Sequence, residues 1–423
     1  MSRVSRSLLL ASVMLGVGFT SASAKTTYTI VHDFAGPSQN DGDKPQSKLV
    51  SDSQGRLYGV TQLGGKNFSG SVFRLTKTGK TWAEETLFSF PSGSGPSGTL
   101  LIGASGELYG TILSGGLGQG TVYRLDPNGS TWTLTTLHQF NPTGAGSHDG
   151  FLPSAGLVFG KDGLLYGTTK GTPPQDGQTA TQNPMYGTVF SVSPMGDTVE
   201  YSVLHIFGGT NDGQFPGFGS LVVNKKGVLI GTTGAGGLHS EGMVFQLTPP
   251  KHGQTAWSEA SVYDFKSAGG DAIGPFYGVV ADKTGVLFGC ANGGHNGNGA
   301  IYALTPPPKH STTWSEQILY SFGDQANDPK SNAVCDVSVS KQGILFGASS
   351  GGGANNTCAI FRAATPASGQ TAWTETVLHS FGLQGSGDAM FPSAAPIEVG
   401  KQVLGVAPSG GAFNRGAVFE VMP

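Results

Sequence analysis

The sequence is poor in charged residues, in cysteine and in long apolar segments. Only 12% of its 423 residues are Asp, Glu, Lys or Arg, and the formal net charge is −3. It contains no run of basic residues, and this absence argues against a surface for nucleic acid. Beyond residue 24, no apolar run approaches the roughly 18 residues of a membrane-spanning helix. We therefore expect a soluble protein that binds no nucleic acid and does not span a membrane.

Residues 1–24 have the pattern of a secretory signal peptide. Arg3 and Arg6 precede a short apolar run at residues 8–17, and a run of small residues ends at Ala24. The apolar run is too short to cross a bilayer. We predict cleavage near Ala24 and a secreted or periplasmic bacterial protein.

Glycine is abundant, with 69 of the 423 residues, about twice the usual fraction. An apolar pair followed by Gly and a Gly-rich loop occurs seven times, as in LYGVTQLGG, LYGTILSGG and LFGASSGGG. The central residues of the seven copies are Tyr58, Tyr109, Tyr166, Ile230, Phe288, Phe346 and Leu404. Their intervals of 51 to 64 residues are typical of a β-propeller, in which each repeat forms one blade.

Each repeat contains four strand-like segments. In the third copy these begin with DGFLPSAGLVFG, LLYGTT and GTVFSV. The fourth segment starts at Trp and ends at Phe eight residues later in five copies, such as WAEETLFSF, so both rings lie on one face of the strand. We expect the apolar pair to insert between neighbouring blades. The glycines after the pair would adopt the positive φ that the return into the third strand needs.

The last repeat lacks a fourth strand. The chain ends in GAVFEVMP, a third-strand segment, whereas TYTIVHDF near the N-terminus matches the fourth-strand segment ETVLHSF. We therefore predict that Thr27–Phe34 forms the outer strand of the seventh blade and closes the ring, which removes open sheet edges. The predicted fold is an all-β, seven-bladed β-propeller with four antiparallel strands per blade, comprising residues 25–423.

The pattern resembles the GloVer tandem repeat, a family of exported bacterial β-propeller proteins. The resemblance rests on LYGTT, the GG pair, GTVF and LHSF, and it extends over the whole chain after the signal peptide. It implies a propeller fold and an exported location, and it implies no particular reaction.

Strand order predicts which segments share a rim of the disc. The Gly-rich loops follow the second strands, and the segments that read DG before a nearby Pro precede the first strands; we call the latter the lead-in segments. Both types lie on the same rim, and the short turns between the first and second strands lie on the opposite one. Ligands of propellers bind where loops from several blades converge, so we expect the Gly-rich rim to be the functional face.

Residues that recur in the repeat have a structural interpretation. The lead-in carboxylates predict Asx-type turns; they are Asp41, Asp149, Asp212, Asp271 and Asp388. Four histidines occupy one fourth-strand position and are predicted to pack in the sheet; they are His32, His138, His205 and His379. GLGQGT imitates a phosphate loop but is flanked by strands and has no GK[ST].

Residues that depart from the repeat on the Gly-rich rim are the candidates for function. The candidates for general acid–base catalysis are His239, His295, His148 and Glu241. The candidates for ligand binding are Tyr186, Tyr277 and Arg415. Three histidines could alternatively hold a metal ion, but their spacing matches no metal motif, and we predict neither a metal nor a cofactor.

Three cysteines in an exported protein predict one disulfide and one free thiol. Cys335 and Cys358 both replace small residues within one repeat, and we predict that they pair. The strand predicted between them is the objection, because Cα atoms beyond about 7 Å cannot be bridged. Cys290 would be the free thiol.

Two functions fit these patterns. In the first, the protein is a monomeric binding module whose Gly-rich rim holds a polysaccharide, a peptide or a cell-surface protein. In the second, it is a carbohydrate-active lyase or hydrolase that uses the rim histidines as acid and base. We favour binding, because the sequence contains no paired carboxylates, Ser-His-Asp set or metal motif.

Overall fold

A computed structural model describes residues 26–115, 118–141, 149–171, 186–195, 199–209, 211–323, 328–366, 373–382 and 387–422. The predicted signal peptide and His148 lie outside these ranges, as do the side chains of residues 330–335. The described residues contain no helix with the length and hydropathy of a membrane span.

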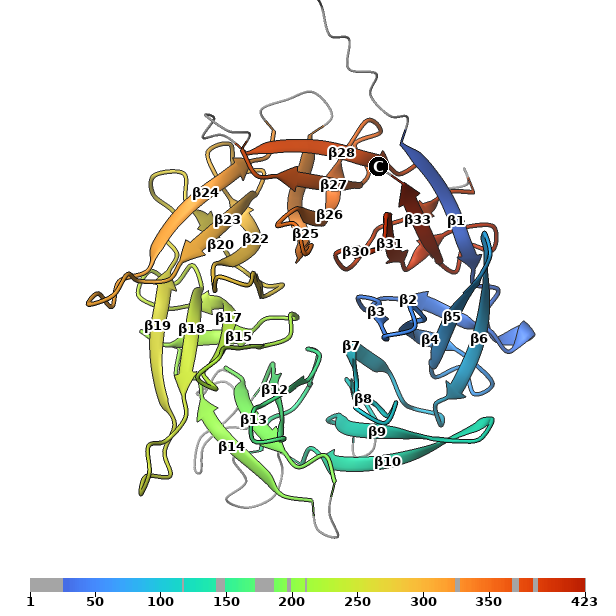
Figure 1. The fold of residues 1–423 in the computed structure, drawn as a ribbon, viewed down its shortest axis with the longest axis horizontal. Helices are drawn as coiled ribbons and strands as arrows, with labels where there is room; N and C mark the ends of the chain where they lie inside the picture. Colours follow the sequence, from blue (N-terminus) through green and yellow to red (C-terminus); the bar gives the residue numbers. More distant parts are fainter. Residues whose placement is uncertain are drawn as a thin grey trace, which may run out of the picture.

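Seven small antiparallel sheets surround a common axis, and the predicted seven-bladed β-propeller is confirmed (Figure 1). Blade 1 contains β2 (Gly42–Pro45), β3 (Val50–Ser51), β4 (Leu57–Gly64), β5 (Ser71–Thr78) and β6 (Thr81–Ser89). Blade 2 contains β7 (Pro96–Ile102), β8 (Leu108–Ile112), β9 (Thr121–Asn128) and β10 (Thr131–Gln139). Blade 3 contains β11 (Val158–Phe159), β12 (Leu165–Thr169), β13 (Thr188–Val192) and β14 (Tyr201–Ile206). A short 3-10 helix, η1 (Pro37–Gln39), precedes blade 1.

The remaining blades repeat this order. Blade 4 contains β15 (Gly213–Pro216), β16 (Val222–Val223), β17 (Leu229–Gly236), β18 (Met243–Thr248) and β19 (Ser258–Asp264). Blade 5 contains β20 (Ala272–Ile273), β21 (Val279–Ala281), β22 (Leu287–Gly293), β23 (Ala300–Thr305) and β24 (Ser315–Ser321). Blade 6 contains β25 (Pro329–Val339), β26 (Leu345–Gly352), β27 (Ala359–Ala364) and β28 (Thr374–Ser380). Blade 7 contains β29 (Ala389–Met390), β30 (Ile397–Val399), β31 (Gln402–Ala407), β32 (Ser409–Gly410), β33 (Ala417–Met422) and β1 (Thr27–Asp33).

The first glycine of the repeated motif makes room for an aromatic ring. A Cβ atom on Gly59 would lie 2.5 Å from the ring of Phe73 on the next strand, and one on Gly347 would lie 2.2 Å from Phe361. The same pairing of Gly with an aromatic ring occurs at this position in all seven blades. The positive φ predicted after the apolar pair belongs to the later glycines, such as Gly64 at 84°. The two glycine positions therefore have different roles: the first leaves space for an aromatic ring, and the later one allows a positive φ.

The two ends of the chain share blade 7, as predicted. β1 pairs antiparallel with β33, from Thr27 opposite Met422 to Asp33 opposite Ala417, with one register shift between Ile30 and His32. Phe34 follows β1 directly, is fully buried, and packs against Phe73 of blade 1 with 5.2 Å between the ring centroids. The N-terminal strand thus completes one blade and contacts the next.

The predicted disulfide is wrong. Cys290 is disulfide-bonded, whereas Cys358 is a buried free thiol that accepts the Phe391 N–H at 3.3 Å. Cys335 lies on β25 and Cys358 directly precedes β27, and β26 runs between these strands within blade 6. Cys290 instead lies on β22 of blade 5, the strand that faces β25 across the blade junction.

Phe34→Ala tests the closure of the ring. We expect it to lower the free energy of unfolding by about 3–5 kcal/mol, because a fully buried ring at the junction of blades 7 and 1 is lost. Chemical denaturation of the purified protein measures the change. Thr29→Ala, at an exposed position of the same strand, is the control and should change stability by less than about 0.5 kcal/mol. Equal stability of the two variants would contradict the role of this strand.

Candidate functional site

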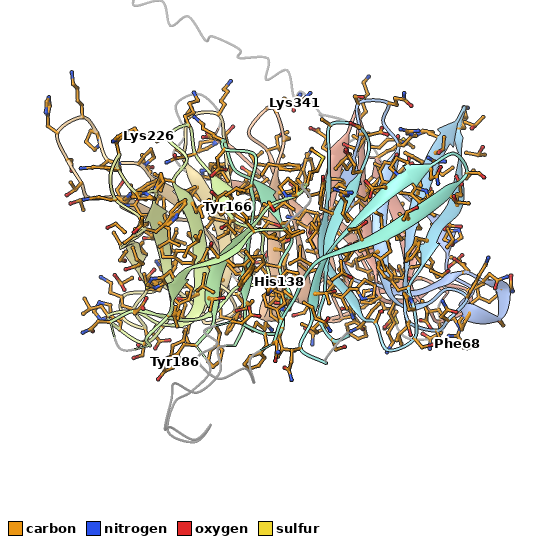
Figure 2. All side chains as sticks on the ribbon, turned by 90° about the horizontal axis from the view of Figure 1, so that it is seen from below. Phe68, His138, Tyr166, Tyr186, Lys226 and Lys341 are labelled. Atoms are coloured by element: carbon orange, nitrogen blue, oxygen red, sulfur yellow. The ribbon has the colours of Figure 1, made fainter. Side chains whose placement is uncertain are left out.

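The lead-in segments and the Gly-rich loops lie on one face of the disc, as the strand order predicts. β2 pairs with the C-terminal end of β4, with Gly42 opposite Gly64, and β15 pairs in the same way with β17. Figure 2 shows Phe68 and Tyr186 towards this face, and Lys226 and Lys341, from turns between first and second strands, towards the other. We call the first of these the glycine face.

The Gly-rich loops turn outwards, away from the axis. In five blades a backbone N–H after the GG pair donates to a side chain at the end of the outer strand. The donors and acceptors are Lys66 to Ser89, Leu238 to Asp264, His295 to Ser321, Ala354 to Ser380 and Ala412 to Asp33, at 2.8 to 3.2 Å. The region around the axis is therefore formed mainly by the lead-in segments and the first strands.

The rim histidines of the catalytic hypothesis do not meet. His239 is exposed in the loop between β17 and β18 of blade 4. His295 is exposed in the corresponding loop of blade 5, where its Nδ1 lies 3.2 Å from Ser321 Oγ on the outer strand. Glu241, partly buried beside His239, accepts the Gly274 N–H through its backbone carbonyl. Among the described residues these side chains form no group of three that could share a metal ion.

Two of the predicted ligand-binding residues have structural contacts on the glycine face. Arg415 forms an ion pair with Asp43 of the blade 1 lead-in segment. Tyr186 is partly buried against the hydrophobic core, and its backbone carbonyl accepts the Phe215 N–H at 2.9 Å. The third, Tyr277, lies on the axis and is described below.

Six blade junctions share an interaction that we call the inter-blade latch. A His or Tyr on the outer strand of one blade hydrogen-bonds the Asp of the next lead-in segment. The pairs are His32–Asp41, His138–Asp149, His205–Asp212, Tyr263–Asp271, Tyr320–Asp328 and His379–Asp388, at 2.9 to 3.3 Å. Each Asp also accepts the backbone N–H directly after the last Phe of the outer strand, at 2.7 to 3.2 Å. The recurring His and Asp predicted to act separately in packing and in turns are thus partners.

A residue from the outer strand of the following blade faces each latch. Tyr28 stacks on His379, and Tyr201 stacks on His138, each with 3.6 Å between ring centroids. Four latches instead face a glutamate, namely Glu84, Glu259, Glu316 and Glu375. At the junction of blades 1 and 2 the latch position holds Phe88, and Leu134 packs in the same apolar cluster. The facing residue therefore matches the polarity of the latch.

Burial and the neighbouring Asp shift the facing glutamates towards the protonated form. Burial and the charge of Asp328 raise the pKa of Glu375 to about 8, and burial with the charge of Asp271 raises the pKa of Glu316 to about 7. Burial acts against ionisation of Asp388 as well, but hydrogen bonds from His379 and backbone N–H groups hold its pKa below the usual value. Asp388 therefore favours its charged form, whereas the raised pKa values of Glu316 and Glu375 favour their protonated forms.

His32, Asp41 and Glu84 form the one group of three metal-ligating side chains among the described residues, with ligand atoms within 4.8 Å of one another. Both carboxylate oxygens of Asp41 already accept backbone N–H groups, from Ala35 at 2.7 Å and Gly42 at 2.6 Å. The group is also a repeat feature, since a latch and a glutamate meet at three other junctions. We interpret it as a latch with its facing glutamate.

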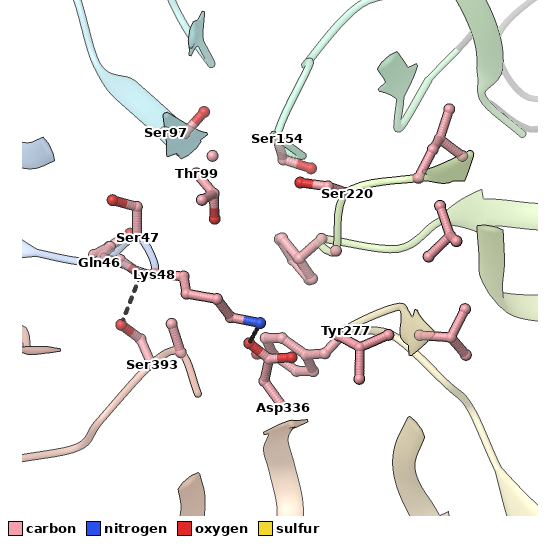
Figure 3. Close-up of a pocket in the computed structure, with 18 of the residues that line it drawn as sticks. Gln46, Ser47, Lys48, Ser97, Thr99, Ser154, Ser220, Tyr277, Asp336 and Ser393 are labelled. Carbon is pink, nitrogen blue, oxygen red and sulfur yellow. Dashed lines mark hydrogen bonds and ion pairs between the residues drawn. The ribbon is translucent and has the colours of Figure 1, made fainter. Parts of the chain in front are cut away.

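A cavity of about 440 Å³ lies on the axis between the first strands. It is lined by residues from all seven blades, among them Gln46, Thr99, Ser154, Ser220, Tyr277 and Ser393 (Figure 3). Gln62 and Leu113, near the ends of second strands, also line it, so the cavity lies towards the glycine face. Its volume is in the range of small-molecule sites in proteins.

The charges in the cavity compensate each other. Lys48 of blade 1 forms an ion pair with Asp336 of blade 6 at 3.1 Å and donates to the Val337 carbonyl at 3.2 Å. Asp336 also accepts the Ala395 N–H of blade 7 at 2.9 Å. Figure 3 shows the ion pair beside Tyr277. Burial and the charge of Asp336 raise the pKa of Tyr277 to about 12, so its hydroxyl stays protonated.

An aromatic wall occupies one side of the cavity. The Tyr277 ring stacks with Phe218, at 5.5 Å between centroids and 24° between planes. Lys170 places its ammonium group 3.3 Å from the centroid of Phe218. Phe218 is 41% exposed although it is large and apolar. Blades 4 and 5 therefore present the rings of Phe218 and Tyr277 to the cavity, and Lys170 of blade 3 lies against the Phe218 ring.

The backbone is strained where the lead-in segments reach the glycine face. The residue before Pro has a positive φ of 55–58° in four blades; these residues are Lys44, Leu152, Phe215 and Phe391. A side chain makes this conformation costly, and blade 5 has Gly274 at the corresponding position. Phe215 and Phe391 are respectively 40% and 48% exposed. Strain of this kind concentrates at functional sites.

These features define a seven-bladed propeller with a small cavity on its axis. The sequence matches the model of the Gloeobacter/Verrucomicrobia repeat over residues 12–181 and 175–338, and the chain belongs to this family. The resemblance seen in the LYGTT and GTVF motifs is thereby confirmed. No curated protein matches the sequence significantly.

Solved structures with similar folds are distant in sequence. The chain is similar to the extracellular domain of a B. thetaiotaomicron protein assigned as a hybrid two-component system, with 12% identity and a TM-score of 0.55. That match covers 94% of this chain and 42% of the other. A Lactobacillus plantarum protein has 14% identity, a TM-score of 0.52 and coverage of 83% and 91%. A hypothetical selenium-binding protein from Sulfolobus tokodaii has 11% identity, a TM-score of 0.52 and coverage of 79% and 80%. At these identities the similarity concerns the fold alone.

Glu375→Gln tests the electrostatics of the latch. A raised pKa in the folded state stabilises the protein below the pKa of the unfolded chain, near 4.5, and this stabilisation is lost as the pH rises through about 8. Gln mimics the protonated side chain, so we expect the variant to be more stable than wild type at pH 8 by on the order of 1–2 kcal/mol, and equally stable at pH 4.5. Denaturant titrations at both pH values measure this.

Glu200→Gln, at an exposed position before β14, is the matched control and should leave the pH dependence unchanged. An identical pH dependence in wild type and Glu375→Gln would show that the facing glutamate is not held in its neutral form.

Proposed function

We propose that this protein is a binding module that holds its ligand in the axial cavity, at the mouth on the glycine face. The observation that carries the proposal is a set of cavity hydroxyls with no protein partner. Thr99, Ser154 and Ser220 make no hydrogen bond within the described part of the chain. Four other polar groups of the lining bind another blade, as Ser393 does by donating to the Gln46 carbonyl at 2.9 Å, and Gln46 and Gln62 bind each other.

The remaining chemistry of the glycine face supports binding at the axis over catalysis at the rim. Four of the nine histidines belong to latches and are committed to holding blades together. His239 and His295 lie in the loops of separate blades and make no contact with each other in the described structure. No geometry among the described residues therefore supports the acid–base hypothesis.

Gln46→Trp tests the location of the site. Gln46 is exposed at the cavity, so a large ring there should obstruct the mouth without disturbing the core. The probes are an array of immobilised polysaccharides and a display library of random peptides. We expect wild type to retain a specific ligand, His239→Ala to retain it equally, and Gln46→Trp to lose at least tenfold in affinity. Thermal melting verifies that both variants are folded.

Two results would contradict the proposal. The first is binding that survives Gln46→Trp and disappears in His239→Ala, which would move the site to the rim. The second is the absence of retained ligand in both probe sets.

We further propose, from the pattern of residues 1–24, that the protein is exported and loses this segment. N-terminal sequencing of the protein recovered from the periplasm and the culture medium of the producing cells should then begin at or near Lys25. Recovery of the uncleaved chain from the cytoplasm alone would contradict export.

A further inference from the structure

We propose that the ligand of the axial cavity is a neutral saccharide, bound through one pyranose ring. This inference rests on the proposed function, since it concerns the same cavity, and it specifies the chemical class of ligand. The argument depends on the polar groups of the wall, its charge and its aromatic surface.

The polar groups of the wall are those that recognise hydroxyls. A serine or threonine hydroxyl donates one hydrogen bond and accepts others, so it pairs best with a ligand group that does both. Thr99, Ser154 and Ser220 come from blades 2, 3 and 4 and lie on one side of the cavity (Figure 3). Gly156 keeps this side open, because a Cβ atom there would lie 2.5 Å from Ser220 Oγ and 3.1 Å from Thr99 Cβ. Three unpartnered hydroxyls from three blades therefore form one polar surface.

The charge of the wall disfavours an ionic ligand. Lys48 and Asp336 neutralise each other, and each has a further backbone partner on blade 6 or blade 7. An anion would have to compete with Asp336 for Lys48, and a cation would have to compete with Lys48 for Asp336. Breaking a partly buried ion pair for a ligand of like charge is costly. A neutral ligand can instead accept a hydrogen bond from Lys48 while the pair stays intact.

The aromatic surface suits the apolar face of a sugar ring. A pyranose has C–H groups on its faces and hydroxyls around its edge, so it matches a wall that combines aromatic rings with hydroxyl groups. Tyr277 supplies the ring, with Phe218 stacked against it, and also adds a hydroxyl whose raised pKa keeps it a donor. Lys170 lies over Phe218 outside the cavity lining, where its charge does not contact the ligand.

The test uses methyl pyranosides of glucose, galactose and mannose as probes, with glucuronate and inorganic phosphate as charged alternatives. Saturation-transfer NMR detects binding, and calorimetry gives the dissociation constant with the full-length mature protein. We expect at least one neutral pyranoside to bind once per chain, and the charged probes to bind at least tenfold more weakly. Ser220→Ala should weaken binding roughly 3- to 10-fold, the effect of one hydrogen bond.

Three variants of aromatic residues test whether binding depends on the Tyr277 ring in the cavity or on any exposed aromatic ring of the glycine face. Tyr277→Ala should abolish detectable binding, whereas Tyr277→Phe should retain most of it. Phe68→Ala is the matched control, because Phe68 is a 67% exposed aromatic residue on the glycine face and lies outside the cavity lining. Unchanged thermal melting shows whether each variant is folded, and Tyr277→Phe keeps the test valid if the alanine variant is not.

Preferential binding of glucuronate or phosphate would overturn the inference. So would pyranoside binding that is lost in Phe68→Ala and kept in Tyr277→Ala. If no pyranoside binds while Gln46→Trp still abolishes retention of a peptide from the library, the ligand class is wrong and the proposed site stands. If Gln46→Trp affects no ligand at all, both proposals fail.

Discussion

The hydrogen-bonded pair of a lead-in Asp with a His or Tyr of the preceding blade is the interaction on which the ring depends. Within a blade, antiparallel pairing holds the four strands together, but nothing in that pairing fixes the angle between one blade and the next. The latch supplies a directional contact at six of the seven junctions, because each carboxylate binds the outer strand of one blade and begins the inner strand of the next. A partly buried carboxylate is costly unless its lone pairs are filled. Hydrogen bonds from backbone N–H groups fill these lone pairs. In Asp41, for example, the two carboxylate oxygens accept bonds of 2.6 and 2.7 Å. At the seventh junction, between blades 1 and 2, Phe88 and Leu134 pack in the same apolar cluster in place of a hydrogen-bonded latch and its facing polar residue.

The latch also decides where chemistry is available. Its four His–Asp pairs resemble catalytic acid–base pairs, but they recur at equivalent positions of different blade junctions. Polar groups that are committed in this way cannot also serve a ligand without weakening a blade junction. The outward turn of the Gly-rich loops has a similar consequence, since it ties their backbone to the outer strands and away from the axis. Among the described residues, the hydroxyls of Thr99, Ser154 and Ser220 make no hydrogen bond, and all three line the cavity on the axis.

Much of this architecture could be predicted from the sequence, because the residues that define the repeat act within a single strand or turn. The spacing of the apolar pairs gave the number of blades, and the match between TYTIVHDF and ETVLHSF gave the closure, since both depend on patterns within a single strand. The pairing of His with Asp was missed, although a signal was present: Phe88 occupies the His position directly before the one lead-in segment that lacks Asp. The disulfide was wrong for a related reason. Contacts across a junction join blades whose relative twist no local pattern encodes, and Cys290 and Cys335 lie on strands that face each other only in the closed ring.

The same limit explains why the site was only partly predicted. Tyr277 was singled out because GPFYG departs from the repeat, and it does line the cavity. Thr99 lies in the first strand β7, and Ser154 and Ser220 lie just before the first strands β11 and β16. No feature of their own segments distinguishes them from the serines that bind a neighbouring blade. What distinguishes them is that Gly156 keeps space between two blades open and that their hydroxyls make no hydrogen bond among the described residues. In this propeller, the proposed binding surface thus consists of hydroxyl groups at repeated positions that lack the inter-blade hydrogen bond made by equivalent residues in other blades. Because that loss is a property of the assembled ring, small changes in blade packing can create or remove such a site while leaving the repeat itself intact.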